Sequence, residues 1–327
     1  MREFAFELAL CARLEERADR VLGRQLGAAV ATPGARVMDV VGVEPGPGFD
    51  RRARITDGTI PPRAIEADVG VGRAVDWRAA MGTSSDWARE AVDEALAVGF
   101  FAAERREGRE YVRQTARYPD DWFGRLVGIE NKPDLDAPGD LARQLRFDVS
   151  LGLFDEVVLA TASYVTGAHL NRLPDAVGVW RVDPDTGERE VVREPSPLPV
   201  GEPGVEPVGE HSLRTDVALV DADEKARKRR RIAERAYGKG WRPAPDAYPP
   251  CTHASATGDG RPYCGALDRV VDPGSDCGDD CPAFDPGEAS TPPVDRLRDD
   301  RTPWVRDPEG TVRRQSGLDR FGRSEPD

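Results

Sequence analysis

The chain has 327 residues, 39% of them hydrophobic, and a formal net charge of -13. A chain of this length can bury one sizeable core and hold smaller modules besides, so we expect two or three structural units. No apolar stretch is long enough for a membrane helix, and the acidic residues near the start (Glu3 and Glu7) do not fit a signal peptide. We therefore expect a cytoplasmic protein with no membrane partner; the sequence does not indicate its oligomeric state.

The acidic surplus is combined with a scarcity of lysine. Only Lys132, Lys225, Lys228 and Lys239 occur among 46 basic residues. Abundant acid and arginine with little lysine are typical of halophilic proteins of haloarchaeal type, because in molar salt the screening length falls to about 3 Å and repulsion between carboxylates is tolerable. The charge therefore excludes binding through a broad basic surface but does not exclude a nucleic-acid partner.

The first part of the chain predicts a helix, a buried strand and an inserted unit. Apolar residues at helical spacing indicate one amphipathic helix over residues 3–27, and the apolar run at 36–43 indicates a buried strand. A helix, a glycine-containing turn and a strand in succession are typical of a winged helix. Within the inserted unit we expect short helices near 61–68 and 73–81, a longer helix at 85–103 and a strand at 110–116.

The second part predicts an α/β layout. We expect strands at 125–132, 156–162 and 177–182, with a helix ending near residue 153 between the first two. Residues 193–215 are rich in proline and glycine and predict a linker, and residues 221–238 predict a charged helix. The predicted organisation is a core in two parts (1–59 and 119–192), the inserted unit (60–118), a linker with the charged helix (193–245), a cysteine module (246–285) and a disordered tail (286–327).

Glu130 and Lys132 are two residues apart on the strand predicted at 125–132, so both side chains point to the same face. Val127 and Ile129 point the other way, into the core. A surface ion pair between Glu130 and Lys132 is one explanation, but arginine would serve equally well in a chain that hardly uses lysine. The compact charge of lysine beside a scissile phosphate is the explanation that we prefer.

Asp39 and Glu7 supply further carboxylates in apolar surroundings. Asp39 is in the middle of the apolar strand, where an unpaired carboxylate is costly, so we expect it either to bind metal or to pair with a core arginine or backbone N–H groups. Glu7 is on the apolar face of the first helix; it is either a third acidic site residue or a favourable charge near the helix N-terminus. Carboxylates that hold Mg²⁺ through oxygen, with a positive group near the attacking water, are what a hydrolytic phosphodiesterase needs.

The order of Glu7 on a helix, Asp39 on a strand, the segment G-I-E-N-K at 128–132 and a following helix with Gln144 resembles the PD-(D/E)XK (restriction-endonuclease-like) nuclease superfamily. The resemblance covers residues 3–50 and 120–182. It implies a restriction-endonuclease-like core in which Asp39 and Glu130 hold Mg²⁺ or Mn²⁺ and Lys132 orients or activates the water. Glu7 matches the glutamate on the first helix of many members, and Gln144 matches a glutamine of RecB-like and Cas4-like members.

The chain departs from the superfamily pattern at two positions and offers an alternative at a third. Met38 stands where the pattern has a proline, and Asp148, one turn after Gln144, stands where RecB-like members have a tyrosine. Asp120 follows a proline and is an alternative first acidic ligand. We prefer Asp39, because Asp120 and Asp121 have the character of turn residues.

Two arginine-rich segments are candidates for contacts with nucleic acid. The predicted wing carries Arg105, Arg106, Arg109 and Arg113, which could reach phosphates or a groove, although the adjacent helix is acidic and the unit could be a packing module. The run from Lys225 to Arg231 could follow a phosphate backbone, but such a run is more often a solvated helix.

Four cysteines are grouped near the C-terminus. Their spacing, C-x12-C-x12-C-x3-C among Gly, Pro and Asp, predicts a small module that a metal holds together. Zn²⁺ is the first choice, and His253 could replace one thiolate. A [4Fe-4S] cluster is the alternative, in which Cys11 could take part, and free or paired thiols are the remaining explanation. The predicted ligands are Cys251, Cys264, Cys277 and Cys281.

Two functions from different classes follow. The first is metal-dependent hydrolysis of phosphodiester bonds in a nucleic acid, DNA before RNA. The second is a non-catalytic DNA-binding or regulatory protein on a degenerate nuclease fold, in which the winged-helix-like unit and the zinc module carry the function. Convergence of Asp39, Glu130 and Lys132 would favour the first.

Overall fold

The computed structural model describes residues 2–303 apart from residues 18, 54–59, 62, 65, 66, 82–85, 116–119, 137, 138, 185, 244–246, 279, 291 and 292. The protein is a mixed α/β protein, as the sequence predicts. Its described residues form two compact units, one from within 1–44 and 125–302 and one from within 45–124. In the described part of the chain, no helix is both long and apolar enough to cross a membrane.

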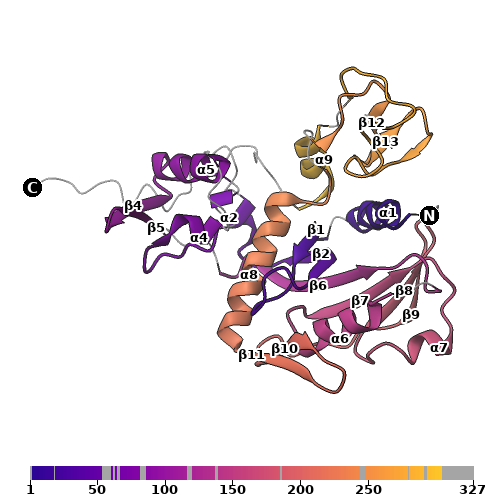
Figure 1. Ribbon diagram of the computed structural model, residues 1–327, viewed down its shortest axis with the longest axis horizontal. Coiled ribbons are helices and arrows are strands. Elements are labelled where there is room, and N and C mark those ends of the chain that lie inside the picture. The colour runs from indigo at the N-terminus through magenta and orange to yellow at the C-terminus, as the bar shows by residue number, and fades with distance from the viewer. Residues whose placement is uncertain are drawn as a thin grey trace, which may run out of the picture. The chain divides into compact units, whose positions relative to one another are not determined.

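A six-stranded mixed sheet forms the centre of the first unit (Figure 1). Strands β6, β7 and β8 are parallel, whereas β1 is antiparallel to β2 and β9 is antiparallel to β8. In spatial order the strands are β1 (Val21–Gly27), β2 (Val37–Pro45), β6 (Phe123–Asn131), β7 (Glu156–Thr161), β8 (Gly178–Val182) and β9 (Arg189–Arg193).

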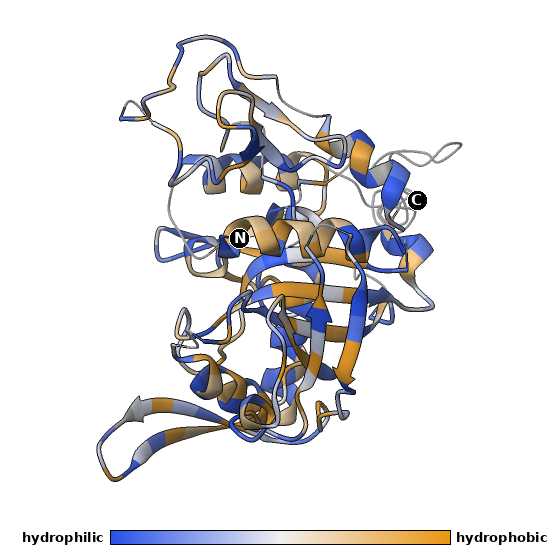
Figure 2. Cartoon of the chain, turned by 90° about the vertical axis from the view of Figure 1, so that its right-hand side faces the viewer, coloured by the Kyte–Doolittle hydropathy of each residue, from blue (hydrophilic) through white to orange (hydrophobic). Residues whose placement is uncertain are grey.

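Helices cover both faces of this sheet. The apolar side chains of α1 (Glu3–Glu15) form one buried cluster with Leu22 of β1 and Ile129 of β6. On the opposite face, α8 (Ala222–Lys239) lies so close to β1 that a Cβ on Gly23 would be 2.6 Å from the Cα of Ala236. Helix α6 (Leu141–Leu151) connects the parallel strands β6 and β7, and α7 (Gly167–Leu170) is a short turn before β8. Figure 2 shows hydrophobic residues concentrated in the central strands.

The prediction of one helix over residues 3–27 is wrong, because α1 ends at Glu15 and β1 begins at Val21. Apolar spacing continues through this segment, but Gly23 and Gly27 disfavour a helix, and pairing with β2 fixes the chain as a strand. The strands predicted at 36–43, 125–132, 156–162 and 177–182 are confirmed as β2, β6, β7 and β8.

The segment predicted as a linker, residues 193–215, contains a strand and the start of another. Strands β10 (Gly204–Glu210) and β11 (Thr215–Val220) form an antiparallel hairpin that starts inside it. The Lys225 side chain, 0% exposed, donates to the carbonyls of Pro199 and Glu202 at 2.8 Å each, and so fixes the segment before the hairpin. Two residues of the basic run, Lys225 and Arg229, are therefore buried and used to hold the fold.

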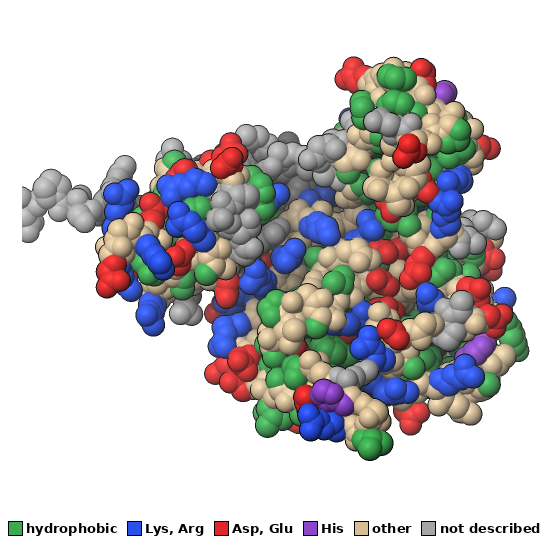
Figure 3. Space-filling view, viewed as in Figure 1, with side chains coloured by type: hydrophobic (Ala, Val, Ile, Leu, Met, Phe, Trp, Pro, Cys, Tyr) green, Lys and Arg blue, Asp and Glu red, His purple; other side chains and the backbone are tan. Residues whose placement is uncertain are grey.

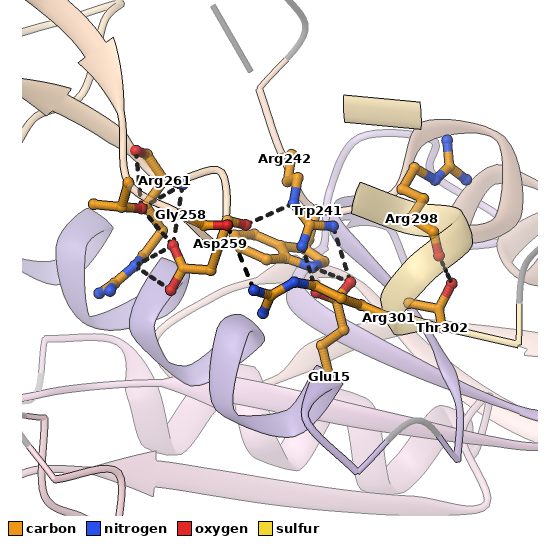
Figure 4. A network of polar contacts seen from close by, with 10 residues as sticks. Glu15, Trp241, Arg242, Gly258, Asp259, Arg261, Arg298, Arg301 and Thr302 are labelled. Atoms are coloured by element: carbon orange, nitrogen blue, oxygen red, sulfur yellow. Dashed lines mark hydrogen bonds and ion pairs between the residues drawn. The ribbon is translucent and has the colours of Figure 1, made fainter. Parts of the chain in front are cut away.

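The cysteine-containing segment forms a small three-stranded sheet that is attached to α1 and α8 by polar contacts. Glu15 at the end of α1 accepts hydrogen bonds from the Nε1 of Trp241 and the Nη1 of Arg242, each at 2.9 Å (Figure 4). Arg242 also donates to the carbonyl of Asp259 at 2.7 Å. We call Glu15, Trp241 and Arg242 the balanced cluster. The segment comprises β12 (Ala254–Ala256), β13 (Pro262–Cys264), β14 (Arg269–Val270) and, after them, α9 (Val294–Arg301).

Helix α9 lies within the tail that we predicted to be disordered from residue 286, so the prediction is wrong for residues 294–301. The rest of that prediction, from residue 304 on, lies outside the described residues.

The second unit is a three-stranded sheet with helices around its own apolar core. The helix predicted at 85–103 is shorter, because Gly99 adopts a positive φ of 75° after α5 and β4 follows. The helix predicted at 73–81 is divided between a strand and a helix, and part of the one predicted at 61–68 lies outside the described residues. The elements are α2 (Phe49–Ala53), β3 (Val75–Asp76), α4 (Trp77–Met81), α5 (Asp86–Ala97), β4 (Phe101–Arg106) and β5 (Arg109–Gln114), with sheet order β3-β5-β4.

Candidate functional site

Four acidic side chains gather where α1, β2, β6 and α6 meet. Glu7 of α1 is 4% exposed, Glu130 of β6 is 6% exposed and Asp148 of α6 is 2% exposed, while Asp39 of β2 is partly buried. Burial raises the pKa of each of the other three and the negative charge of Asp39 adds to this effect, so Asp39 lies within electrostatic reach of all three. We call these four residues, with Arg36 and Arg24, the acid-rich cluster.

The two faces of β6 explain how the acids meet. Val127 and Ile129 point into the apolar cluster under α1, so Glu130 points to the opposite face, on which α6 lies. Asn131 returns to the α1 face, where its Nδ2 donates to Glu7 at 3.2 Å and to Asp39 at 3.0 Å. The end of β6 thereby connects acids on both sides of the sheet.

Arg36, one residue before β2, joins two of the acids on the α6 side. Its guanidinium donates to both carboxylate oxygens of Asp148, at 3.0 and 2.7 Å, and to Glu130 at 2.6 Å. Burial disfavours the charged guanidinium, but the two carboxylates outweigh this effect and raise the pKa of Arg36 above its ordinary value. Such a two-oxygen contact fixes the orientation of both partners.

Two amide side chains join the acids on the α1 side. The Nε2 of Gln25 donates to Glu7 at 3.0 Å and to Asp39 at 3.2 Å, and the backbone N–H of Asn131 donates to Asp39 at 2.9 Å. Gln25 has a φ of 53°, which a residue with a side chain rarely adopts. The Oδ1 of Asn131, a residue that is 0% exposed, has no hydrogen-bond partner among the described residues. This leaves a buried oxygen acceptor unsatisfied beside the acids.

The acids exceed the bases in this cluster. Four carboxylates face two guanidinium groups, since Arg24 pairs with Glu7 and Arg36 pairs with Glu130 and Asp148. Burial, and then the charge of Asp39, raise the pKa of Glu130 to about 8, and burial raises the pKa values of Glu7, Asp39 and Asp148. This surplus of negative charge would stabilise a bound cation.

The predicted site residues are brought together only in part. Glu7, Asp39 and Glu130 share the cluster, but the Nζ of Lys132 donates to Glu3 at 3.3 Å rather than to Glu130. Glu3 lies near enough to Asp39 to raise its pKa, so Lys132 is at the same end of the sheet. Gln144 lines a groove beside Arg36. Asp120, the alternative ligand, is exposed in a turn.

The four C-terminal cysteines line one small cavity of about 20 Å³, room for a single water or ion. Burial, and the neighbouring thiols of Cys264, Cys281 and Cys251, raise the pKa of Cys277, so these three thiols lie within electrostatic reach of it. His253 is not among the described residues that line the cavity. Cys11, a residue of α1, is buried in the apolar cluster and is not among the cysteines that line this cavity. In the described part of the chain, no three His, Cys, Asp or Glu side chains are spaced as ligands of a metal ion.

Sequence reasoning missed Arg36, Gln25 and Asn131. Asn131 lies between Glu130 and Lys132, and a buried asparagine inside an apolar strand was a signal that could have been used. Arg36 directly precedes the apolar strand, but nothing local shows that it pairs with Asp148, 112 positions away. Gln25 was assigned to the first helix, which hid its position opposite Asp39.

The fold and the site thus define an α/β protein with a buried, acid-rich cluster at the end of a mixed sheet. Residues 21–286, most of the chain, match the family described as a family of unknown function (DUF5787), and the chain belongs to that family. No curated protein and no solved structure matches the chain.

Proposed function

We propose that this protein is a divalent-metal-dependent nuclease of the PD-(D/E)XK type, with Asp39 and Glu130 as metal ligands. The observation that carries the proposal is the pair of electrostatically coupled carboxylates on the neighbouring strands β2 and β6, in a cluster with more acid than base. A purely structural cluster would gain stability from equal numbers of acids and bases. A surplus of buried carboxylates is costly unless a bound proton, as the raised pKa of Glu130 indicates, or a cation compensates it.

The donor set fits a hard cation such as Mg²⁺ or Mn²⁺. Carboxylate oxygens from Asp39 and Glu130, with Glu7 nearby, are the ligand type that these ions prefer. The unsatisfied Oδ1 of Asn131 adds a neutral oxygen at the same place. The order of the side chains also supports the resemblance: Glu7 on a helix, Asp39 on a strand, then Glu130 on a strand followed by the helix that carries Gln144.

Each residue has a role in this proposal. A bound Mg²⁺ supplies Lewis acidity and lowers the pKa of a water molecule. Asp39 and Glu130 would hold the ion, and Arg36, itself fixed by Asp148, positions the Glu130 carboxylate. Lys132, the only lysine before Lys225, would orient the attacking water or the phosphate from the end of β6.

The second unit supports a nucleic-acid substrate. Its helices α4 and α5 followed by the β4–β5 hairpin, with β3 beside β5, fit the predicted winged-helix arrangement. Arg106 and Arg109 are opposite each other next to the hairpin turn, where a wing would contact phosphates. This observation also favours the alternative function, a non-catalytic DNA-binding protein.

The cysteine module would serve as a structural zinc site. The four thiols line an ion-sized cavity in a segment with little apolar core of its own, so a metal would contribute directly to its folding. Elemental analysis of the purified protein tests this point. One zinc per chain supports it, and iron with visible absorbance indicates the [4Fe-4S] alternative. The absence of both metals would contradict a metal site.

Cleavage of labelled DNA and RNA in Mg²⁺ or Mn²⁺ at molar KCl tests the proposed nuclease. We expect wild-type protein to cleave and the Glu130→Gln variant to lose at least about a thousandfold in rate, as removal of a group that acts on the transition state does. Glu156→Gln is the matched control, because Glu156 is in the adjacent strand β7 and pairs with Arg125 outside the cluster. DNA binding without cleavage by the wild type, unchanged in Glu130→Gln, would favour the non-catalytic function.

A further inference from the structure

A groove lies between α6 and the β10–β11 hairpin of the first unit. It encloses about 500 Å³, within the range of about 300–1,000 Å³ that is usual for ligand sites. Arg143, Gln144 and Arg146 line it from α6, and Pro207 and Val208 line it from the hairpin. Arg36 lines it too, next to the acid-rich cluster.

The groove is held open by buried polar contacts rather than by mobile side chains. The Glu206 carboxylate, 0% exposed, accepts hydrogen bonds from the backbone N–H groups of Val30, Ala31 and Thr32 at 2.6, 2.9 and 2.8 Å. On the other side, the Oγ of Ser150 donates to the carbonyl of Val205 at 3.0 Å. The hairpin is therefore fixed to both the β1–β2 loop and α6, and the groove exists before a ligand binds.

The charge of the groove is opposite to that of the chain. Its described lining holds Arg143, Arg146 and Arg36, the last paired with Glu130 and Asp148, and no acidic residue, although the protein has a net charge of -13. Arg146 is exposed and, among the described residues, makes no hydrogen bond or ion pair, while Arg143 pairs with Asp140 at the surface. Figure 3 shows basic side chains over α6. These guanidinium groups are suited to phosphate.

The opposite wall of the groove is apolar. Val208 is 44% exposed, and Pro207 lies beside it on the same strand. Figure 2 shows the hairpin projecting from the sheet with hydrophobic residues along it. Apolar side chains on one wall and arginines on the other suit a polymer with flat bases and a phosphate backbone.

The groove is connected to the acid-rich cluster through one side chain. Arg36 lines the groove and donates to Glu130 at 2.6 Å. A ligand that lies along α6 therefore has its end beside the proposed metal ligands.

We infer that the groove between α6 and the β10–β11 hairpin binds a single strand of nucleic acid, with phosphates on Arg143 and Arg146 and bases against Pro207 and Val208. This inference rests on the proposed function for the role of the strand as substrate. A single strand fits because its bases are free to reach the apolar wall, whereas in a duplex they are stacked inside.

Fluorescence anisotropy of the full chain with a labelled poly(dT) oligonucleotide tests the inference, with Ca²⁺ in place of Mg²⁺ and over a series of KCl concentrations. We expect the double variant Arg143→Glu/Arg146→Glu to bind at least about tenfold more weakly. The negative slope of log K against log[salt] should become less steep by about 1.4, because two phosphate contacts are lost. The matched control is Arg17→Glu/Arg172→Glu, which makes the same charge change at two exposed positions outside the groove. Control binding should remain close to wild type.

The outcomes separate this inference from the proposed function. If the groove variant binds and cleaves like the control while Glu130→Gln is inactive, the groove inference is overturned and the nuclease stands. If Glu130→Gln cleaves normally but the groove variant loses oligonucleotide binding, the proposed catalytic site fails and the groove remains a nucleic-acid site. Equal competition by a duplex or by polyglutamate overturns the assignment to a single strand. Circular dichroism and melting temperature show whether each variant folds.

Discussion

The acid-rich cluster and the balanced cluster both bury acidic and basic side chains in the first unit, but they differ in composition. In the balanced cluster one carboxylate, Glu15, faces one guanidinium, Arg242, and the Nε1 of Trp241 satisfies it further. In the acid-rich cluster four carboxylates face two guanidinium groups, and the side-chain oxygen of Asn131 has no partner in the part of the chain that the structure describes. The balanced cluster is complete as it stands, whereas the other would be stabilised by a cation. A fold that needs only stability has no use for the surplus, so we relate the surplus to function.

Removing the acid of the balanced cluster has the largest expected effect on stability. Glu15→Ala leaves Arg242, which is 5% exposed, without its carboxylate partner and should lower the free energy of unfolding by about 3–5 kcal/mol. Glu16→Ala, at the neighbouring exposed ion pair with Arg13, is the control and should change it by less than about 1 kcal/mol. Chemical denaturation measures both. A small loss for Glu15→Ala would show that the two clusters do not differ as described.

Metal should stabilise one cluster only. Mg²⁺ at about a hundred times its dissociation constant should raise the free energy of unfolding of the wild type by about 2.7 kcal/mol. Glu130→Gln should lose this response because a ligand is gone, and Glu156→Gln should keep it. Thermal and urea unfolding with and without Mg²⁺ give the values. An equal response in all three proteins would mean that the ion binds elsewhere.

The pH dependence of stability should reveal the surplus acid. The pKa of Glu130 is about 8 in the folded protein, above the ordinary value of 4.5, so the folded state holds a proton that the unfolded state has lost between these values. The contribution of this group to stability is therefore largest below pH 4.5 and decreases as the pH rises towards 8. In the absence of metal, the wild type should lose about 1–3 kcal/mol between pH 6 and pH 8 relative to Glu130→Gln. Parallel pH profiles for the two proteins would contradict this pKa.

Lys132 should have the smallest effect on stability. Its partner is Glu3, and the two side chains are 25% and 53% exposed, so the ion pair is worth less than about 1 kcal/mol. Lys132→Ala should therefore leave the melting temperature close to that of the wild type and abolish cleavage while nucleic-acid binding persists. Cleavage near the wild-type rate, with a large drop in melting temperature, would make Lys132 a structural residue.

The parts of the fold that local pattern decides were predictable. Continuous apolar runs identified β2, β6, β7 and β8, and the charge pattern identified α8. Strand β1 could not be predicted because its apolar spacing continues that of α1. The need for a glycine at position 23 becomes clear only from its packing against Ala236. The β10–β11 hairpin was hidden by its proline and glycine content, because the buried contacts that fix it come from residues distant in sequence.

The candidate site shows the same limit. Glu7, Asp39 and Glu130 could be singled out because a carboxylate within an apolar helix face or strand is unusual. Asn131, a buried asparagine inside an apolar strand, could have been singled out in the same way. Arg36 and Gln25 could not, since they act through contacts between elements. The expected approach of Lys132 to Glu130 also depended on the neighbouring helix, and α1 instead offers Glu3 to the lysine.

The most direct test of the central claim is X-ray diffraction from crystals soaked in Mn²⁺, with anomalous difference maps collected near the manganese edge. The account predicts a peak in contact with the carboxylates of Asp39 and Glu130, present in the wild type and absent in Glu130→Gln. Maps without a peak at the acid-rich cluster, in wild-type crystals that bind Mn²⁺ elsewhere, would contradict it.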